Sequence, residues 1–232
     1  MILIGLTGGI ACGKSTVCRF LIEEHGIAVI DADLVVRELQ QPGTACMKQI
    51  AKRWPQCIVA ETGELDRLAL GKIIFENPDA RKVLGRIMNG PIFLALLKKI
   101  LWLWWRSPRG AVVILDAPTL FETGTLTYFI SSALVVACAE EKQVARLRLR
   151  NGFSEQDARH RIHAQMPLAK KRQLAGYVLA NDTDDLVALR RQVDDSVSWM
   201  RLQNPHRLTL MISVVCVMFT GTAVGALLLV RK

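Results

Sequence analysis

The order of apolar and polar residues along the chain predicts short buried strands separated by helices. The apolar run at residues 1–6 is followed by Val17, Phe20 and Leu21, which are spaced as on one face of a helix. Strands that alternate with helices indicate a parallel sheet with helices on both faces. The predicted fold class is therefore α/β, with a five-stranded parallel sheet. The expected strands cover residues 1–6, 27–30, 111–115, 133–138 and 177–180.

A helix-rich insertion, residues 44 to about 106, interrupts this alternation. Asn77 and Pro78 are expected to start one of its helices, and Asn89-Gly90-Pro91 to interrupt another. The stretch 92–105 is almost wholly apolar, but it is too short and too charged to span a bilayer. We expect a helix buried against the sheet. The alternative is that its tryptophans, Trp102, Trp104 and Trp105, touch a membrane interface.

Residues 208–230 form a segment of 23 residues without a charge. As a helix it would be about 34 Å long, which exceeds the roughly 30 Å of a bilayer's hydrocarbon core. We therefore expect a transmembrane helix; the alternative, a buried core helix, would normally show a polar stripe. No signal peptide is recognisable and only Arg231 and Lys232 follow the segment, so we expect a tail anchor. The rest of the chain would then face the cytosol, on the outer mitochondrial membrane or the endoplasmic reticulum.

The residues directly after the first strand carry the clearest chemical signal. Residues 8–15 fit the spacing G-x-x-x-x-G-K-[ST] of a phosphate-binding loop. Glycines in such a loop let backbone N–H groups converge on one anion at the start of the following helix. Lys14 is expected to reach the β- and γ-phosphates, and Ser15 to offer its hydroxyl to Mg²⁺. The expected nucleotide contacts are Gly8, Gly9, Ile10, Ala11, Cys12, Gly13, Lys14, Ser15 and Thr16.

The formal net charge of +9 suggests an anionic partner. Because the chain has no run of like charges and no basic tract interleaved with aromatics, phosphorylated small molecules are favoured over nucleic acid. The six cysteines lack C-x-x-C spacing, which indicates reduced thiols and no structural zinc. Cys12 lies beside a helix N-terminus and Lys14, both of which favour a thiolate. A reactive thiol that ATP protects and an inert packing thiol both stay open.

Carboxylates follow two of the predicted strands. Asp31 and Asp33 follow the second strand, and Asp116 ends the third in the manner of a Walker B strand. In open α/β sheets, ligands bind at the carboxyl ends of the strands. Phosphoryl transfer to an alcohol needs an acceptor for the hydroxyl proton, which a carboxylate can supply. The alternative is a pair of helix N-caps, which explains one acid better than both.

Together these motifs resemble those of dephospho-coenzyme A kinases, P-loop enzymes that phosphorylate the ribose 3′-hydroxyl of dephospho-CoA in the last step of CoA synthesis. The resemblance covers about residues 2 to 193 and rests on the order and spacing of several segments. These are residues 6–16, Ile30-Asp31-Ala32-Asp33 with Arg37 and Gln41-Pro42-Gly43, Gly63-Glu64-Leu65-Asp66-Arg67, residues 116–122, and Ala164-Gln165-Met166-Pro167. The family's His-Pro pair is replaced here by Asn89-Gly90.

The resemblance implies a P-loop kinase fold that uses ATP and Mg²⁺. Residues 1–203 would form the kinase domain, with 44–106 as a helical substrate-binding insertion and about 150–167 as a lid. Asp33 is similar to the family's general base, which would act with Lys14 and Arg150. Asp31, Arg37 and Asp116 would lie at the substrate, with Asp31 orienting Mg²⁺ or water. The arginines Arg146, Arg150 and Arg161 resemble those of the family's lid, which closes over ATP; the alternative is a solvated helix face.

The leading hypothesis is a membrane-anchored dephospho-CoA kinase. One alternative is another small-molecule P-loop kinase, which would not need Asp31 and Asp33 together with Arg37. A second is a membrane-tethered nucleotide-dependent switch, although the D-x-x-G and N-K-x-D patterns of GTP switches are missing. Nothing in the sequence indicates the oligomeric state.

Overall fold

The computed structural model describes residues 1–205, 208, 210, 212 and 213. The chain forms two compact units, the first made of Met1–Ile30 with the described residues from Ser107 on, and the second of Asp31–Arg106. Each unit has a hydrophobic core of its own. The limits predicted for a kinase domain, its insertion and its lid stay predictions. Apart from Leu208, Leu210, Ile212 and Ser213, the predicted transmembrane segment 208–230 lies outside the described residues.

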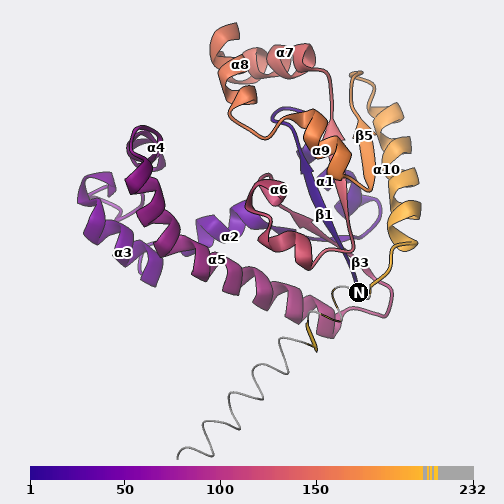
Figure 1. Cartoon of the computed structure of the whole chain (residues 1–232), viewed down its shortest axis with the longest axis horizontal. Helices are drawn as coiled ribbons and strands as arrows, with labels where there is room; N and C mark the ends of the chain where they lie inside the picture. The colour runs from indigo at the N-terminus through magenta and orange to yellow at the C-terminus, as the bar shows by residue number, and fades with distance from the viewer. Residues whose placement is uncertain (206–207, 209, 211, 214–232) are drawn as a thin grey trace, which may run out of the picture. The chain divides into compact units, whose positions relative to one another are not determined.

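The first unit is built on a five-stranded sheet in the order β2-β3-β1-β4-β5 (Figure 1). The central strand β1 pairs in parallel with β3 and β4, and β4 pairs in parallel with β5. The strands span Ile2–Gly8 (β1), Ala28–Asp31 (β2), Val112–Asp116 (β3), Ser132–Ala137 (β4) and Tyr177–Ala180 (β5). The five strands predicted from the apolar runs are thus confirmed, and so is the α/β class with a parallel sheet.

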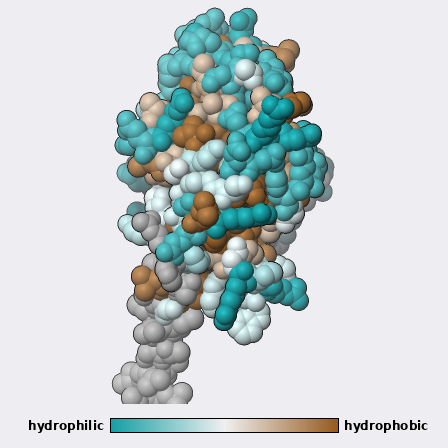
Figure 2. All heavy atoms as spheres, turned by 90° about the vertical axis from the view of Figure 1, so that its right-hand side faces the viewer, coloured by the Kyte–Doolittle hydropathy of each residue, from teal (hydrophilic) through white to brown (hydrophobic). Residues whose placement is uncertain are grey.

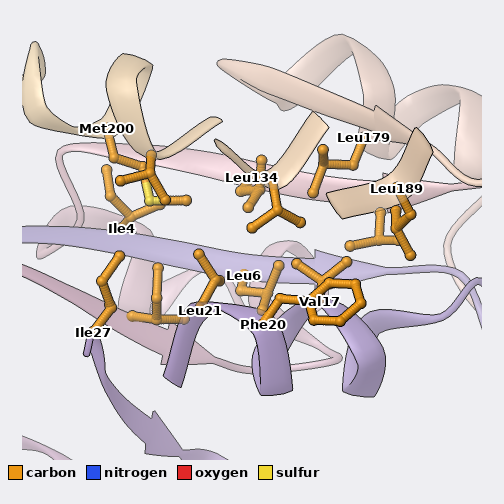
Figure 3. Packing of buried hydrophobic residues seen from close by; sticks show 14 of the residues in the cluster. Ile4, Leu6, Val17, Phe20, Leu21, Ile27, Leu134, Leu179, Leu189 and Met200 are labelled. Atoms are coloured by element: carbon orange, nitrogen blue, oxygen red, sulfur yellow. The ribbon is translucent and has the colours of Figure 1, made fainter. Parts of the chain in front are cut away.

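Apolar side chains on the sheet and its helices explain why β1 lies at the centre. All seven residues of β1 are buried, because helices cover both of its faces. On one face, Ile4 and Leu6 join a core that includes Leu21 of α1 and Met200 of α10 (Figure 3). On the other face, a Cβ on Gly5 would come within 2.5 Å of Leu120 in α6. The helical elements of this unit are Lys14–Glu23 (α1), Leu120–Thr123 (α6), Thr125–Tyr128 (η2), Glu140–Asn151 (α7), Glu155–His163 (α8), Leu168–Leu174 (α9) and Leu186–Arg201 (α10).

Helices α7 and α8 form a hairpin, and its second half falls within the segment 150–167 predicted to be a lid. Gly152 ends α7 in a left-handed conformation, φ 67°, and the Ser154 hydroxyl accepts a hydrogen bond from the Asp157 N–H at the start of α8. The hairpin is at the top of Figures 1 and 2, where the surface is mostly hydrophilic. Its small core, built on Val144 and Leu147, packs on Ile10 and Ala11.

The second unit is helical and has a core of its own. Its buried residues include Cys46, Ile50, Trp54, Leu70 and Met88. The N-caps Thr44 and Asp66 accept backbone N–H groups at the starts of α3 and α4. The elements span Ala32–Leu39 (α2), Ala45–Arg53 (α3), Pro55–Cys57 (η1), Arg67–Glu76 (α4) and Pro78–Arg106 (α5).

Helix α5 runs without a break through Asn89-Gly90-Pro91, so the interruption predicted there is wrong. Proline has no N–H, which deprives the carbonyl four residues earlier, that of Ile87, of its helical partner. The Cys46 thiol lies 3.9 Å from the Ile87 carbonyl oxygen and supplies a weak donor to it. The buried Met88 packs against the core of this unit on the same stretch of helix. Tertiary packing therefore overrides the local helix-breaking signal.

The tryptophan-rich end of α5 also differs from expectation. The apolar stretch 92–105 is not a short separate helix but the second half of one of 29 residues. Trp102 and Trp105 are 56% and 83% exposed, so the predicted burial fails for them. Among the described residues, α5 is the one helix long and apolar enough to cross a membrane by length and composition. Core helices of soluble proteins meet the same criterion, and a tryptophan contact with a membrane interface stays a prediction.

The continuity of α5 can be tested with Gly90→Ala. A Cβ at Gly90 would meet nothing within 4 Å, so alanine should stabilise the protein by about 0.5–1 kcal/mol through its better helix propensity. The matched control is Gly152→Ala, which forces a Cβ into the left-handed region and should cost about 1 kcal/mol. Urea unfolding of the two variants should shift in opposite directions. A Gly90→Ala variant less stable than the unmodified chain would mean that the helix is broken there.

Candidate functional site

Residues 9–13 connect β1 to α1 at the carboxyl edge of the sheet. The Cys12 N–H donates to the Gly9 carbonyl at 3.2 Å, which turns the chain back on itself. Ala11 and Gly13 both have left-handed backbones, with φ 59° and 95°. Successive residues of alternating handedness point their N–H groups into one concavity. The N-terminus of α1, which begins at Lys14, adds to this anion-binding hollow.

The carbonyl groups of the loop are held by side chains from later parts of the chain. Gln143 Nε2 donates to the Ile10 carbonyl at 2.7 Å, and Asn181 Nδ2 donates to the Cys12 carbonyl at 2.9 Å. Between them, Arg146 Nη1 donates to the Ala11 carbonyl at 3.4 Å. The loop therefore has three consecutive carbonyls with donors from elsewhere in the unit, and its backbone shape is fixed by these bonds.

Two glycines of the loop are needed because these amide side chains come close. A Cβ on Gly9 would lie 2.5 Å from Gln143 Nε2, and a Cβ on Gly13 would collide with Asn181 Nδ2. Gly13 also has a positive φ, which disfavours any residue with a Cβ. The requirement for glycine at position 13 of the motif thus has a steric cause outside the motif, and Gly9, at a variable position of the motif, is constrained in the same way.

Lys14 begins α1 and forms an ion pair with Asp116 Oδ1 at the end of β3. The parallel register places Asp116 beside Leu6, at the same edge of the sheet as the loop. The other oxygen of Asp116 lies 3.4 Å from the Cys18 thiol. Asp116 therefore neutralises Lys14 and holds its ammonium next to the anion-binding hollow.

The three predicted lid arginines have different surroundings. Arg146 is bound to the Ala11 carbonyl and also to the loop after β5, where it contacts the Asn181 carbonyl and Asp184. Lys142 and Arg146 hold the pKa of the Asp184 carboxyl below its usual range. Arg150 instead donates to Asn151 Oδ1, and Arg161 lies over the Phe153 ring. The structure thus brings Arg146, but neither Arg150 nor Arg161, into contact with the loop; their predicted roles toward ATP stay untested.

Asp31 and Asp33, the two acids predicted after the second strand, have different places in the structure. Asp31 Oδ1 accepts the Leu34 N–H at 2.9 Å and is the N-cap of α2. Asp33 lies in the first turn of α2 and is exposed. Arg37 follows it four residues later, on the same face of the helix. The N-cap alternative therefore accounts for Asp31, and the role of Asp33 as a base stays a prediction. Contact of Asp31, Arg37 and Asp116 with substrate stays a prediction.

The cysteine of the loop is a packing thiol. Cys12 is buried, and its sulfur lies 3.3 Å from that of Cys138 at the end of β4. The hydrogen bond to Cys138 and burial raise the pKa of Cys12. Burial and the contact with Cys138 favour the inert packing alternative, while the reactivity of Cys12 and its protection by ATP stay predictions.

Sequence reasoning missed Gln143, Asn181 and Lys171, which bind the backbone of the loop or of the strand end before it. Gln143 and Asn181 are nearly inaccessible polar residues, and Lys171 is fully buried. A signal was present for Gln143, a polar residue beside Val144 on the apolar side of an amphipathic helix. Partners more than 130 residues away in sequence could not be assigned from it.

Comparison with known proteins identifies the kind of site. A family model described as dephospho-CoA kinase matches residues 2–186 of the chain. A rice dephospho-CoA kinase is 39% identical over 235 aligned positions, which cover 98% of this chain and 97% of the rice protein. The chain belongs to the dephospho-CoA kinase family. A zebrafish dephospho-CoA kinase domain-containing protein is 42% identical over 206 positions, covering 86% of this chain and 89% of its own.

Solved structures agree with this fold. A Thermus thermophilus protein has a TM-score of 0.74 at 30% identity, over 88% of this chain and 98% of its own. The Campylobacter jejuni dephospho-CoA kinase, at 20% identity, has a TM-score of 0.58 over 85% of this chain and 96% of its own, which supports the P-loop kinase fold. As a dephospho-CoA kinase, this chain is an enzyme of the last step of CoA biosynthesis.

The tethering of the loop can be tested with Gln143→Met, which keeps the shape of the side chain and removes the amide donor. Loss of the bond to the Ile10 carbonyl should weaken ATP binding about tenfold, because a buried acceptor loses its partner. The control is Gln156→Met on the exposed surface of α8, which should bind ATP as the unmodified enzyme does. Calorimetric titration with ATP gives the comparison. Equal affinities of the two variants would show that Gln143 does not shape the loop.

Proposed function

We propose that the enzyme transfers the γ-phosphoryl group of ATP to the ribose 3′-hydroxyl of dephospho-CoA, with Lys14 and the loop N–H groups at the phosphates. The observation that carries this assignment is the loop of residues 9–13, whose carbonyls accept hydrogen bonds from side chains of later segments. Lys14 follows the loop directly and is paired with Asp116. Lys14 would exchange the carboxylate of Asp116 for phosphate oxygens when ATP binds. Hydrogen-bond donors held in fixed positions stabilise the transition state of phosphoryl transfer more than mobile donors do, because they do not have to reorganise during the reaction.

The donor set also fits a magnesium ion. Mg²⁺ prefers hard oxygen ligands and keeps several waters, and the site offers the exposed hydroxyl of Ser15 and the carboxylate of Asp116. In this proposal Ser15 and Asp116 hold the ion. When bound, it neutralises charge on the phosphates.

Asp33 is proposed as the general base that accepts the proton of the 3′-hydroxyl. Its support is the family resemblance of the segment 30–33, in which Asp31 is the N-cap of α2. Arg37 would hold an anionic group of the same substrate. Arg146, Arg150 and Arg161 would close over ATP, with Arg146 starting from its place at the loop.

A turnover assay tests the reaction itself. The enzyme should form CoA from ATP and dephospho-CoA, whereas another small-molecule P-loop kinase would leave dephospho-CoA unchanged. Lys14→Ala should lower kcat by about 100-fold or more, because it removes the charge that meets the γ-phosphate. Lys170→Ala, an exposed neighbour of the buried Lys171 on α9, serves as the control and should be unaffected. Turnover of Lys14→Ala within a few-fold of the unmodified enzyme would contradict the assignment of the loop.

The assignment of the base is tested with two isosteric changes. Asp33→Asn should lower kcat by a factor of about 100 or more with little change in ATP affinity, because it removes only the proton acceptor. Asp31→Asn is the matched comparison, since asparagine caps a helix as well as aspartate does. Asp31→Asn should lower kcat much less than Asp33→Asn does. A severe Asp31→Asn and a mild Asp33→Asn in steady-state assays would reverse the two roles.

We also propose that the segment 208–230 anchors the enzyme in a membrane, with the kinase domain in the cytosol, on the outer mitochondrial membrane or the endoplasmic reticulum. The support is the length of the segment and its lack of charges. The full chain should stay with membranes through a carbonate wash, and a chain ending at Asn204 should be soluble and active. Protease added to intact organelles should digest the kinase domain. Release by carbonate, or protection from protease, would contradict the proposal.

A further inference from the structure

Lys171, on α9, is a buried cation to which the mechanism above gives no role. Its side chain is 0% exposed, and its ammonium lies 2.8 Å from Glu122 Oε1. It also donates to the Pro118 carbonyl at 3.0 Å and to the Gly8 carbonyl at 3.4 Å. An ammonium has three N–H donors, and these three acceptors match them. A buried charge is retained at a cost unless it is paired and hydrogen-bonded in this way.

The acceptors of Lys171 belong to the two segments that form the phosphate site. Gly8 ends β1 and starts the loop, while Pro118 and Glu122 lie in the segment that follows Asp116. This segment runs along the end of β1, since the Ala117 N–H donates to the Leu6 carbonyl at 3.0 Å. The Pro118 carbonyl also accepts the Thr7 hydroxyl at 2.9 Å. The Lys171 ammonium therefore joins the end of β1, where the loop starts, to the segment that directly follows Asp116, the counter-ion of Lys14.

The stretch around Lys171 holds the loop at a second point. Gln165, six residues earlier, accepts the Ile10 N–H at 3.0 Å. The chain that returns from the α7–α8 hairpin is thus bonded to the loop through Gln165 and to the strand end before it through Lys171. A change at Lys171 would loosen the position of Asp116 relative to Lys14 without removing either residue.

We propose that Lys171 is a positioning residue for phosphoryl transfer, which holds Gly8, Pro118 and Glu122 together so that Lys14 and Asp116 keep their relative placement. It acts through these groups and does not touch ATP. This inference rests on the proposed function of the loop in the same site. A residue that only stabilised the fold would lower the melting temperature of its variants and leave the kcat of the folded enzyme unchanged.

The burial of the two partners allows stability to be separated from activity. Glu122→Gln leaves a fully buried ammonium without its anion, whereas Lys171→Met leaves a carboxylate whose side chain is 25% exposed and can be solvated. The melting temperature should therefore fall more in Glu122→Gln than in Lys171→Met. The double variant Lys171→Met/Glu122→Gln has no unpaired charge and should regain most of the loss. The double variant still lacks the hydrogen bonds that the Lys171 ammonium donates to the Gly8 and Pro118 carbonyls.

The decisive measurement is kcat in these variants at a temperature well below the melting point of each. Lys171→Met and the double variant should both lose about tenfold to 100-fold in kcat, with the KM for dephospho-CoA changed less than twofold. Lys170→Met on the same helix should keep the activity of the unmodified enzyme. Recovery of kcat together with the melting temperature in the double variant, or a Lys171→Met variant with kcat within threefold, would reduce Lys171 to a structural residue.

A second readout keeps this test independent of the substrate. If the unmodified enzyme did not phosphorylate dephospho-CoA, the proposed function would fail, but the placement of the loop could still be measured by ATP titration. Lys171→Met should then bind ATP about tenfold more weakly than Lys170→Met. Equal ATP affinities would overturn the positioning role. Should Glu122→Gln fail to fold, Lys171→Met and the double variant still carry the comparison.

Discussion

Backbone N–H groups that converge on one point repel each other until an anion fills the space between them. The loop of residues 9–13 has this arrangement, and its surroundings hold it in place. Gln143, Arg146 and Asn181 bind its carbonyls, so the loop is held from the outside. Asp116 neutralises the lysine at its end. The repulsion is thus opposed during folding, and an incoming phosphate meets donors that are already in position.

Much of the fold could be predicted from the sequence because its signals are local. An apolar run marks each of the five strands, and the runs of β1, β3 and β4 are apolar throughout because these strands are buried on both faces. The phosphate loop was recognisable for a related reason, since its glycines, Lys14 and Ser15 occupy eight consecutive positions. Neither the strand order nor the partners of Lys171 could be predicted, because both depend on which distant segments meet. A polar residue such as Asn181 looks like an ordinary surface residue until its partner is known.

The break predicted in α5 failed for the opposite reason, because a strong local signal was overruled by packing. Asn89-Gly90-Pro91 would end an isolated helix, but the thiol of Cys46 lies against the carbonyl that Pro91 leaves without a partner. At Asp31 the local interpretation as a helix cap was the correct one. Local signals therefore predict best where no other segment competes for the same backbone groups.

The tethers of the loop also have a consequence for the order in which the chain folds. The loop comes early in the first unit, yet the side chains that bind it or the strand end before it lie 133 to 169 residues later in the sequence. Contacts of such sequence separation form late, because the chain between them must first be gathered. The loop leaves the ribosome before its partners do and is thus among the last segments to reach its final shape. A nascent chain that has not reached Asn181 has the motif but not the site, and ATP can stabilise only the completed unit.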